Sequence, residues 1–221
     1  MTRRRFSHPQ LSHPAARLLQ FVASLFIAST LTGASLADEG WIELFNGKDL
    51  SGWKVNENTD SVKVEDGLMV VHGPRAHAFY VGSGEFKNFY LKAELMTYPK
   101  ANSGIYFHTK YQADGWPKKG FECQVNVSHK DPKKTSSLYG VVNVADPGVK
   151  DNQWYTQEII VKGKNVKLIV NGKTMVDYTE PDDAKPAEGG FDRLIGKGTF
   201  ALQAHDPKSK VYFRNLRVKP L

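Results

Sequence analysis

The sequence predicts an all-β protein of the sandwich or jelly-roll type. Short apolar segments alternate with turn-forming residues over the whole chain after residue 37. In the longest segment, residues 89–98, apolar and polar side chains alternate with a period of two, which is typical of a strand with one buried face. No window after residue 37 has sustained helical periodicity, and no internal repeat is visible. Many short strands separated by turns therefore indicate two packed antiparallel sheets in one domain.

The expected strands follow one another from residue 41 to residue 218. Asp66-Gly67 and Asn171-Gly172 are hairpin signals, because each dipeptide supplies the positive φ that a tight turn needs. We expect at least ten strands, drawn from residues 41–45, 62–64, 68–72, 77–81, 89–98, 102–108, 120–126, 155–161, 166–170, 174–178, 199–205 and 210–218.

The apolar phases of these strands define the expected core. A side chain that alternates with polar neighbours along a strand faces the packed side of the sheet. The lone cysteine, Cys123, lies in such a phase and has no partner for an internal disulfide, so we interpret it as a small core residue rather than a nucleophile. The residues expected to be buried are Phe89, Leu91, Phe107, Phe121, Cys123, Val125 and Leu202.

The first 37 residues are predicted to be a signal peptide, which leaves residues 38–221 as the mature domain. Arginines precede an apolar run at residues 18–31 that is short for a membrane span, and Ser35-Leu36-Ala37 suits cleavage before Asp38. The start also resembles a twin-arginine signal, so the export route, Sec or twin-arginine, stays open. We expect a periplasmic or secreted protein with no membrane contact after cleavage; the alternative is an uncleaved N-terminal anchor.

The charge balance argues against a nucleic-acid partner. The chain has a formal net charge of +7, but four arginines lie in the leader. Without them 26 basic residues face 23 acidic ones, and no basic run is left to follow a phosphate backbone.

Three expected strands carry an unusual set of polar side chains. In each strand the polar residues alternate with buried ones, so they share one face of the sheet if the strands are neighbours. Such a face is either solvated or lines a polar groove. Amides, aromatic rings and a carboxylate are the groups that bind sugar hydroxyls. The residues are Tyr106 and His108, Glu122 and Gln124, and Gln203 and His205.

Two long loops do not fit the rhythm of the strands. Residues 110–119 and 179–197 are rich in Pro, Gly and charge, and loops of this length in a compact domain are often functional. The first loop joins two polar-faced strands, so it is expected at the rim of any groove. Trp116, Lys119 and Arg193 are the expected rim contacts; the alternative for each is a side chain that only covers a sheet edge.

A series of short motifs runs through the chain in a specific order and spacing. The motifs are Trp41 to Trp53, Asn102-Ser103-Gly104, Phe121 to Val125, Leu138-Tyr139-Gly140, Trp154 with Glu158, Val170-Asn171-Gly172, Leu202 to Asp206 and Phe213 to Val218. Together they resemble the 3-keto-disaccharide hydrolase domain family over residues 41–221. The resemblance implies a concanavalin A-like jelly roll in secreted bacterial proteins linked to carbohydrate breakdown. It also implies action on sugars oxidised at C3, by elimination across C1 and C2 or by hydration of the resulting glucal.

The residues on the expected groove favour elimination over ordinary hydrolysis. Jelly-roll glucanases place Glu-x-Asp-x-Glu on one strand face, with two carboxylates as nucleophile and acid. Here the same register has Glu122, Gln124 and Asn126, and an amide can neither attack nor give up a proton. A ketone at C3 removes the need for the pair, since it acidifies the C2 proton and lets one base eject the aglycone.

These considerations give a set of expected site residues. Glu122, His108 and His205 are the expected catalytic groups, and a divalent metal held by His108, Glu122 or His205 could polarise the ketone. The expected ligand is a 3-keto-sugar or related glycoside. The alternative is a non-catalytic carbohydrate-binding module that uses the same groove. The expected sugar-binding residues are Gln124, Gln203, Tyr106, Asn102, Tyr139, Trp116 and Arg193.

Overall fold

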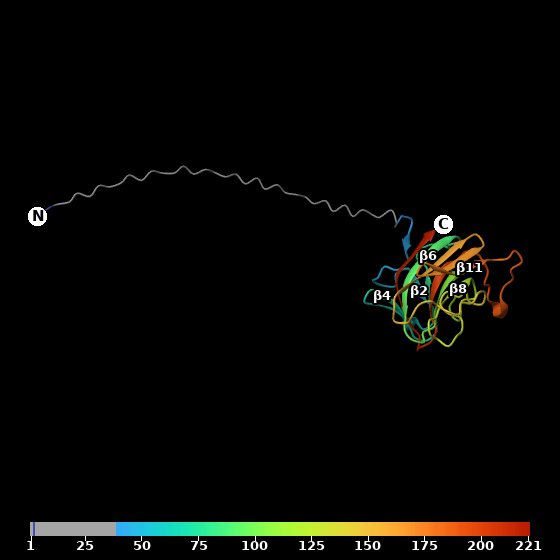
Figure 1. Ribbon diagram of the computed structural model, residues 1–221, viewed down its shortest axis with the longest axis horizontal. Helices are drawn as coiled ribbons and strands as arrows, with labels where there is room; N and C mark the ends of the chain where they lie inside the picture. The colour runs from blue at the N-terminus through green and yellow to red at the C-terminus, as the bar shows by residue number, and fades with distance from the viewer. Residues whose placement is uncertain (1, 3–38) are drawn as a thin grey trace. The chain divides into compact units, whose positions relative to one another are not determined.

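The computed structural model describes residue 2 and residues 39–221 (Figure 1). The predicted signal peptide and its cleavage before Asp38 lie, apart from residue 2, outside the described residues. Within the described part of the chain, no helix has the length and apolar character needed to cross a membrane.

The described chain forms two antiparallel sheets. The larger sheet has the strand order β11-β10-β9-β6-β13-β4-β3, with β1 also paired to β13, and the smaller has the order β2-β5-β12-β7-β8. The larger sheet contains β1 (Ile42–Glu43), β3 (Val62–Glu65), β4 (Leu68–His72), β6 (Phe89–Thr97), β9 (Tyr155–Lys162), β10 (Asn165–Val170), β11 (Lys173–Thr179) and β13 (Lys210–Pro220). The smaller contains β2 (Trp53–Val55), β5 (Ala76–Tyr80), β7 (Ser103–Thr109), β8 (Phe121–Val125) and β12 (Thr199–Ala204).

The prediction of an all-β sandwich with at least ten strands is confirmed. The only helical turns in the described residues are the short 3₁₀ segments η2 (Thr59–Ser61) and η3 (Glu188–Gly190). At both predicted hairpins the residue before the glycine also has positive φ: Asp66 at +49° and Asn171 at +46°. This is the backbone that two-residue hairpin turns require.

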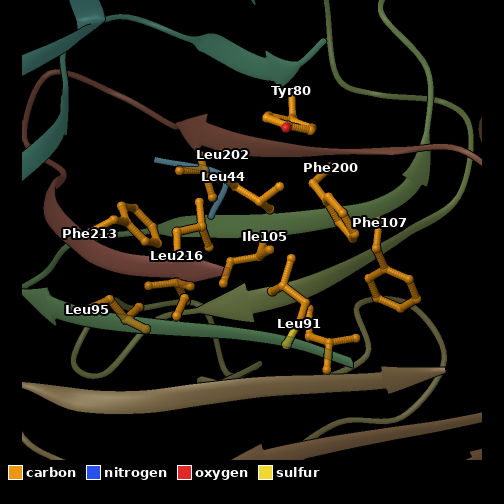
Figure 2. Close-up of a cluster of buried hydrophobic side chains, with 14 of the residues drawn as sticks. Leu44, Tyr80, Leu91, Leu95, Ile105, Phe107, Phe200, Leu202, Phe213 and Leu216 are labelled. Carbon is orange, nitrogen blue, oxygen red and sulfur yellow. The ribbon is translucent and has the colours of Figure 1, made fainter. Parts of the chain in front are cut away.

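The core lies between the two sheets (Figure 2). All seven side chains predicted to be buried have no exposed surface. Cys123 belongs to this core, where burial raises the pKa of its thiol to about 12. The interpretation of Cys123 as a packing residue is therefore confirmed, since a thiol held in that form is a poor nucleophile.

Three strands of the smaller sheet, β5, β7 and β8, are buried on both faces. Every residue of β5, β7 and β8 is buried, polar phase included. On the face away from the core, Phe79, Tyr106 and Ala201 form a second, small apolar cluster. The polar phase of these strands is therefore covered rather than solvated, because loops fold over it.

A matched pair of valine substitutions tests the core. Val161 on β9 is fully buried, whereas Val81 just after β5 is 54% exposed. We expect Val161→Ala to lower the free energy of unfolding by about 2 kcal/mol, from lost burial and the cavity left behind. Val81→Ala should change it by less than about 0.5 kcal/mol. Urea unfolding of both variants is the measurement, and equal effects would contradict the assigned strand register.

Candidate functional site

The site is built on one face of the smaller sheet, where β7 and β8 are paired. Tyr106 lies opposite Glu122, and Gly104 lies opposite Gln124. Residues directly opposite in an antiparallel pair project to the same face, so the carboxylate, phenol and amide lie side by side. The prediction that these polar residues share a face is confirmed.

The next strand, β12, continues this polar face across the sheet. Ala201 lies opposite Tyr106 of β7, and Gln203 lies opposite His77 of β5. The alternation of His77 and Phe79 with Ala76 and Ala78 is visible in the sequence, and it could have placed His77 on this face. Sequence reasoning did not include it.

The polar face forms the floor of a pocket of about 340 Å³. This volume is within the range of small-molecule sites. Glu122, His205 and all seven predicted sugar-binding residues line it. Of the five side chains predicted to converge in one pocket, Glu122, Gln124, Gln203 and His205 do so, and His108 does not. Asp131 and Phe191 also line it and were missed, because they belong to loops whose folding over the sheet has no periodic signal. The lining residues are Asn102, Tyr106, Trp116, Glu122, Gln124, Asp131, Tyr139, Phe191, Arg193, Gln203 and His205.

Both long loops reach the pocket rim, as predicted. Trp116 comes from the loop between β7 and β8, and Phe191 and Arg193 come from the loop between β11 and β12. Lys119, also expected at the rim, is not among the lining residues.

Glu122 is held at the centre of the pocket by hydrogen bonds from two other strands. The Tyr106 hydroxyl donates to its Oε2 over 2.8 Å, and the Gln203 amide nitrogen donates to its Oε1 over 3.2 Å. Gln203 also donates to the Tyr106 hydroxyl over 2.9 Å. Burial raises the pKa of Glu122 above its ordinary value, although the Tyr106 hydrogen bond and the Arg193 charge oppose the shift.

Space for the carboxylate is provided by Gly104. A Cβ atom at this position would lie only 2.5 Å from Oε1 of Glu122, so any other residue would displace the carboxylate. In the amide orientation that pairs both its oxygen and its nitrogen, Gln124 donates to the carbonyl oxygen of Ser103 over 2.8 Å and to Oε1 of Glu122 over 3.3 Å. The carboxylate therefore has donors from β7, β8 and β12.

Arg193 brings a fixed positive charge to the pocket. Its Nη1 donates to the carbonyl oxygen of Gly120 over 3.0 Å, and its guanidinium lies 4.8 Å from the ring centre of Phe191 and 5.9 Å from that of Tyr106. The side chain is buried, and its backbone has a φ of +47°. A buried guanidinium with planar donors is suited to an anionic oxygen.

His205 is oriented by an acidic neighbour. Its Nδ1 lies 2.8 Å from Oδ2 of Asp206, and the Ser209 hydroxyl donates to the same oxygen over 2.8 Å. Burial raises the pKa of Asp206, but the hydrogen bonds from His205 and Ser209 outweigh it and hold the pKa below its ordinary value. An ionised carboxylate at Nδ1 keeps a proton there and leaves Nε2 as the atom that faces a ligand.

The prediction that His108 faces the groove is wrong. His108 has a φ of +54°, and the pairing of β7 with β12 shifts its register beside it, between Thr199 and Ala201. This irregularity breaks the two-residue alternation and turns the ring towards Phe89, at a centroid distance of 5.6 Å. Its Nε2 donates to the carbonyl oxygen of Lys87, and burial lowers its pKa. His108 is a neutral structural residue in this arrangement.

The predicted metal ligands do not converge. With His108 turned away, only Glu122 and His205 of the three proposed ligands line the pocket. Within the described residues no cluster of three or more His, Cys, Asp or Glu side chains has an arrangement that could hold a metal ion. The expected ligands His108, Glu122 and His205 therefore do not fit a divalent metal, and the reaction proposed below uses none.

The comparisons define the class of protein. The 3-keto-alpha-glucoside-1,2-lyase-like domain family matches residues 40–219, nearly the whole described chain. The chain belongs to this family, as its motifs predicted. A comparison with curated proteins gave no match.

Solved structures agree with this assignment. A proposed glycosyl hydrolase from Parabacteroides distasonis is 26% identical with a TM-score of 0.72, over 84% of this chain and 95% of that one. A second from the same organism is 24% identical with a TM-score of 0.64, over 82% and 99%. A Bacillus subtilis protein of unknown function with a galectin-like fold is 12% identical with a TM-score of 0.51, over 81% and 94%. The concanavalin A-like jelly roll is thereby confirmed, and the chain is a carbohydrate-related, glycosyl hydrolase-like protein.

The raised pKa of Glu122 predicts a pH-dependent effect of Glu122→Gln on stability. A carboxyl group with a raised folded-state pKa stabilises the fold most below its unfolded pKa, and this contribution is lost as pH rises through the folded pKa. The glutamine in the variant cannot ionise, so the variant loses no stability from this position as pH rises. We therefore expect the unfolding midpoint of Glu122→Gln, relative to the parent, to rise between about pH 4 and pH 8.

Glu94 offers a matched control with the opposite sign. Hydrogen bonds from Asn215 and Arg214 lower its pKa, so its carboxylate stabilises the fold above the unfolded pKa and ceases to do so as pH falls. The midpoint of Glu94→Gln relative to the parent should therefore fall as pH rises towards the unfolded pKa of about 4.3 and stay level above about pH 5, where the carboxyl group is ionised in both states. Thermal unfolding at several pH values measures both, and parallel trends would contradict the prediction for Glu122.

Proposed function

We propose that the protein cleaves 3-keto-glycosides by elimination across C1 and C2, as an exported enzyme. The observation that carries the proposal is the carboxylate of Glu122, which is the one buried carboxylate among the residues lining the pocket and has the amides of Gln124 and Gln203 beside it. Asp131 also lines the pocket, but it is half-buried and belongs to a loop. Ordinary glycoside hydrolysis uses two carboxyl groups. One carboxylate with a raised pKa is instead suited to removing an acidified proton from carbon.

Glu122 is the proposed general base. Its oxygens face the pocket, and the hydrogen bonds from Tyr106 and Gln203 fix their position. A ketone at C3 makes the C2 proton acidic, and Glu122 takes this proton while negative charge develops on the C3 oxygen. A base whose pKa is raised by burial accepts such a proton more readily than an exposed glutamate does.

Arg193 and His205 complete the proposed reaction. The Arg193 guanidinium would stabilise the enolate oxygen, because charge–charge attraction is strong in a site from which water is excluded. The C1–O bond then breaks, a double bond forms between C1 and C2, and the leaving oxygen takes a proton from Nε2 of His205. For this step His205 starts as the imidazolium, which the Asp206 carboxylate at Nδ1 stabilises, and it ends as the neutral ring. The products are the free aglycone and a 2-hydroxy enone, and the two protons transferred leave no net change in charge.

A carbohydrate-binding module is the second candidate function. The pocket's amides and aromatic side chains, Asn102, Gln124, Gln203, Tyr139 and Trp116, could bind a sugar without converting it. A binding module needs no basic carboxylate, so the effect of removing the Glu122 charge separates the two candidates.

Glu122→Gln should reduce turnover of a 3-keto-glucoside by about two to four orders of magnitude, because it removes the base but keeps the shape of the side chain. Glu94→Gln, the same change on the other sheet, should retain the parent rate. Aglycone release and the ultraviolet absorbance of the enone measure the reaction, and deuterium at C2 should slow the parent. Equal rates for Glu122→Gln and the parent would exclude Glu122 as the base. A parent that binds the sugar but releases no aglycone would favour the binding module.

His205→Ala should affect substrates according to their leaving group. Protonation matters most for a sugar or alkyl aglycone, so we expect a loss of about a hundredfold or more there and a much smaller loss for a nitrophenol aglycone. His72→Ala, at an exposed position on β4, should leave both rates unchanged. The ratio of kcat/KM values for the two substrates is the measurement, and equal losses for both would remove the acid role from His205.

A further inference from the structure

His77 lies beside the pocket with no hydrogen-bond partner in the described chain. It projects from β5 opposite Gln203 and contacts the rings of Tyr106 and Trp116 edge-to-face, at centroid distances of 5.4 and 5.6 Å. The side chain is fully buried, yet neither Nδ1 nor Nε2 has a partner among the described residues. Buried polar atoms have a hydrogen-bond partner in the great majority of cases, so we expect a ligand or water to bind the two nitrogens of this imidazole.

A second unpaired atom lies on the neighbouring strand. Oε1 of Gln203 is also buried without a partner in the described residues, while its amide nitrogen is engaged by Tyr106 and Glu122. Burial lowers the pKa of His77 to about 3, so the ring is neutral at working pH and offers one donor and one acceptor. A hydroxyl group both accepts and donates, and it can therefore satisfy the His77 N–H and the Gln203 oxygen together.

We propose that His77 and Oε1 of Gln203 form a buried subsite that binds a hydroxyl group of the substrate beneath Trp116. The proposal rests on the proposed function, because it takes the ligand of the pocket to be a keto-sugar. Three aromatic rings surround the imidazole of His77: those of Phe79, Tyr106 and Trp116, at centroid distances of 6.1, 5.4 and 5.6 Å. A hydroxyl enclosed in this way would be recognised strongly, because its loss leaves buried polar atoms unpaired.

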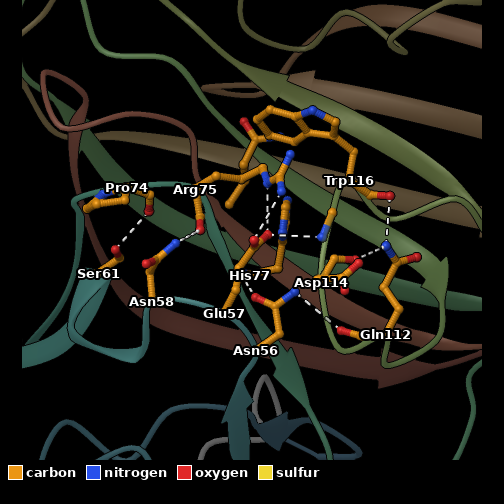
Figure 3. A network of polar contacts seen from close by, with 12 residues as sticks. Asn56, Glu57, Asn58, Ser61, Pro74, Arg75, His77, Gln112, Asp114 and Trp116 are labelled. Carbon is orange, nitrogen blue, oxygen red and sulfur yellow. Dashed lines mark hydrogen bonds and ion pairs between the residues drawn. The ribbon is translucent and has the colours of Figure 1, made fainter.

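Trp116 lies at the pocket wall beside His77, and contacts with neighbouring residues hold it there (Figure 3). Its ring lines the pocket and also covers His77. The Arg75 guanidinium lies 5.3 Å from the Trp116 ring centre and makes two hydrogen bonds to Glu57, at 2.8 and 3.0 Å. Glu57 also accepts from the backbone nitrogen of Gly115 over 3.0 Å. These contacts anchor the loop that carries Trp116 from outside the pocket.

The test compares sugar affinity with stability in His77→Phe. This variant keeps an aromatic ring but removes both nitrogens. We expect binding of a 3-keto-glucoside to weaken about tenfold while thermal stability is unchanged or higher, since two unpaired buried atoms are lost. Calorimetric titration in the Glu122→Gln background avoids turnover. His77→Gln, which keeps a donor and an acceptor, should recover most of the affinity, and His72→Phe at the exposed position should have no effect.

Deoxy analogues of the sugar identify the hydroxyl without relying on any His77 variant. One monodeoxy 3-keto-glucoside should bind the Glu122→Gln protein about tenfold more weakly than the full sugar does. When His77→Phe is added to the same protein, this analogue and the full sugar should bind with equal affinity. If every analogue and every His77 variant binds alike, a water alone satisfies the imidazole and the subsite is overturned. If binding depends on His77 but the parent never releases aglycone, the subsite stands and the proposed reaction fails. If no 3-keto-sugar binds, both fail.

Discussion

The burial of one carboxylate sets the constraint on which the rest of the site depends. Glu122 is removed from water, and leaving it without donors there would cost several kcal/mol. Its donors come from three strands of the smaller sheet, through Tyr106, Gln124 and Gln203. Because a slip of one residue turns every side chain of a strand to the opposite face, a register error in β7 or β12 would leave the carboxylate unpaired. The hydrogen bonds that hold the Glu122 carboxylate therefore require the observed register of this sheet.

The covered face of the smaller sheet gives this arrangement its electrostatic strength. A solvated sheet face would screen Glu122 from Arg193, whereas loops over the sheet bury both. Interactions between charges and dipoles strengthen as water is excluded, so the same groups that orient the carboxylate can also stabilise charge that develops on a ligand. Exclusion of water also makes a buried polar atom costly when it has no partner, as is the case for both nitrogens of His77 among residues 39–221. That cost favours binding of a ligand able to pair them.

Strand periodicity accounts for what the sequence could predict. The alternation of Cys123 with Glu122 and Gln124 predicted both the core and the pocket floor, because a strand has only two faces. The same rule failed at His108, where a positive φ and a register shift reverse the side chain, and no residue type in the sequence marks that irregularity. Asp131 and Phe191 reach the pocket through long-range folding of loops, which local patterns do not encode. His77 is a different case. The sequence shows it alternating with Ala76 and Ala78, but it does not show that its strand pairs with β12.

The presence of one carboxylate, Glu122, on the strands of the pocket floor also bears on the substrates of the proposed reaction. A sugar without a ketone has no acidic proton at C2, so cleavage would need a nucleophile or an activated water opposite a separate acid. Gln124 and Asn126 occupy the strand positions at which a second carboxylate would lie, and Asn126 is already bonded through its amide to the carbonyl oxygens of Asp131 and Lys133. That amide holds the loop that carries Asp131 at the pocket, so a carboxylate there would lose two donors to the loop and place a negative charge against two carbonyl oxygens. The loop closure that builds the pocket thus disfavours a carboxylate at position 126, which supports the proposal that the substrates are sugars oxidised at C3.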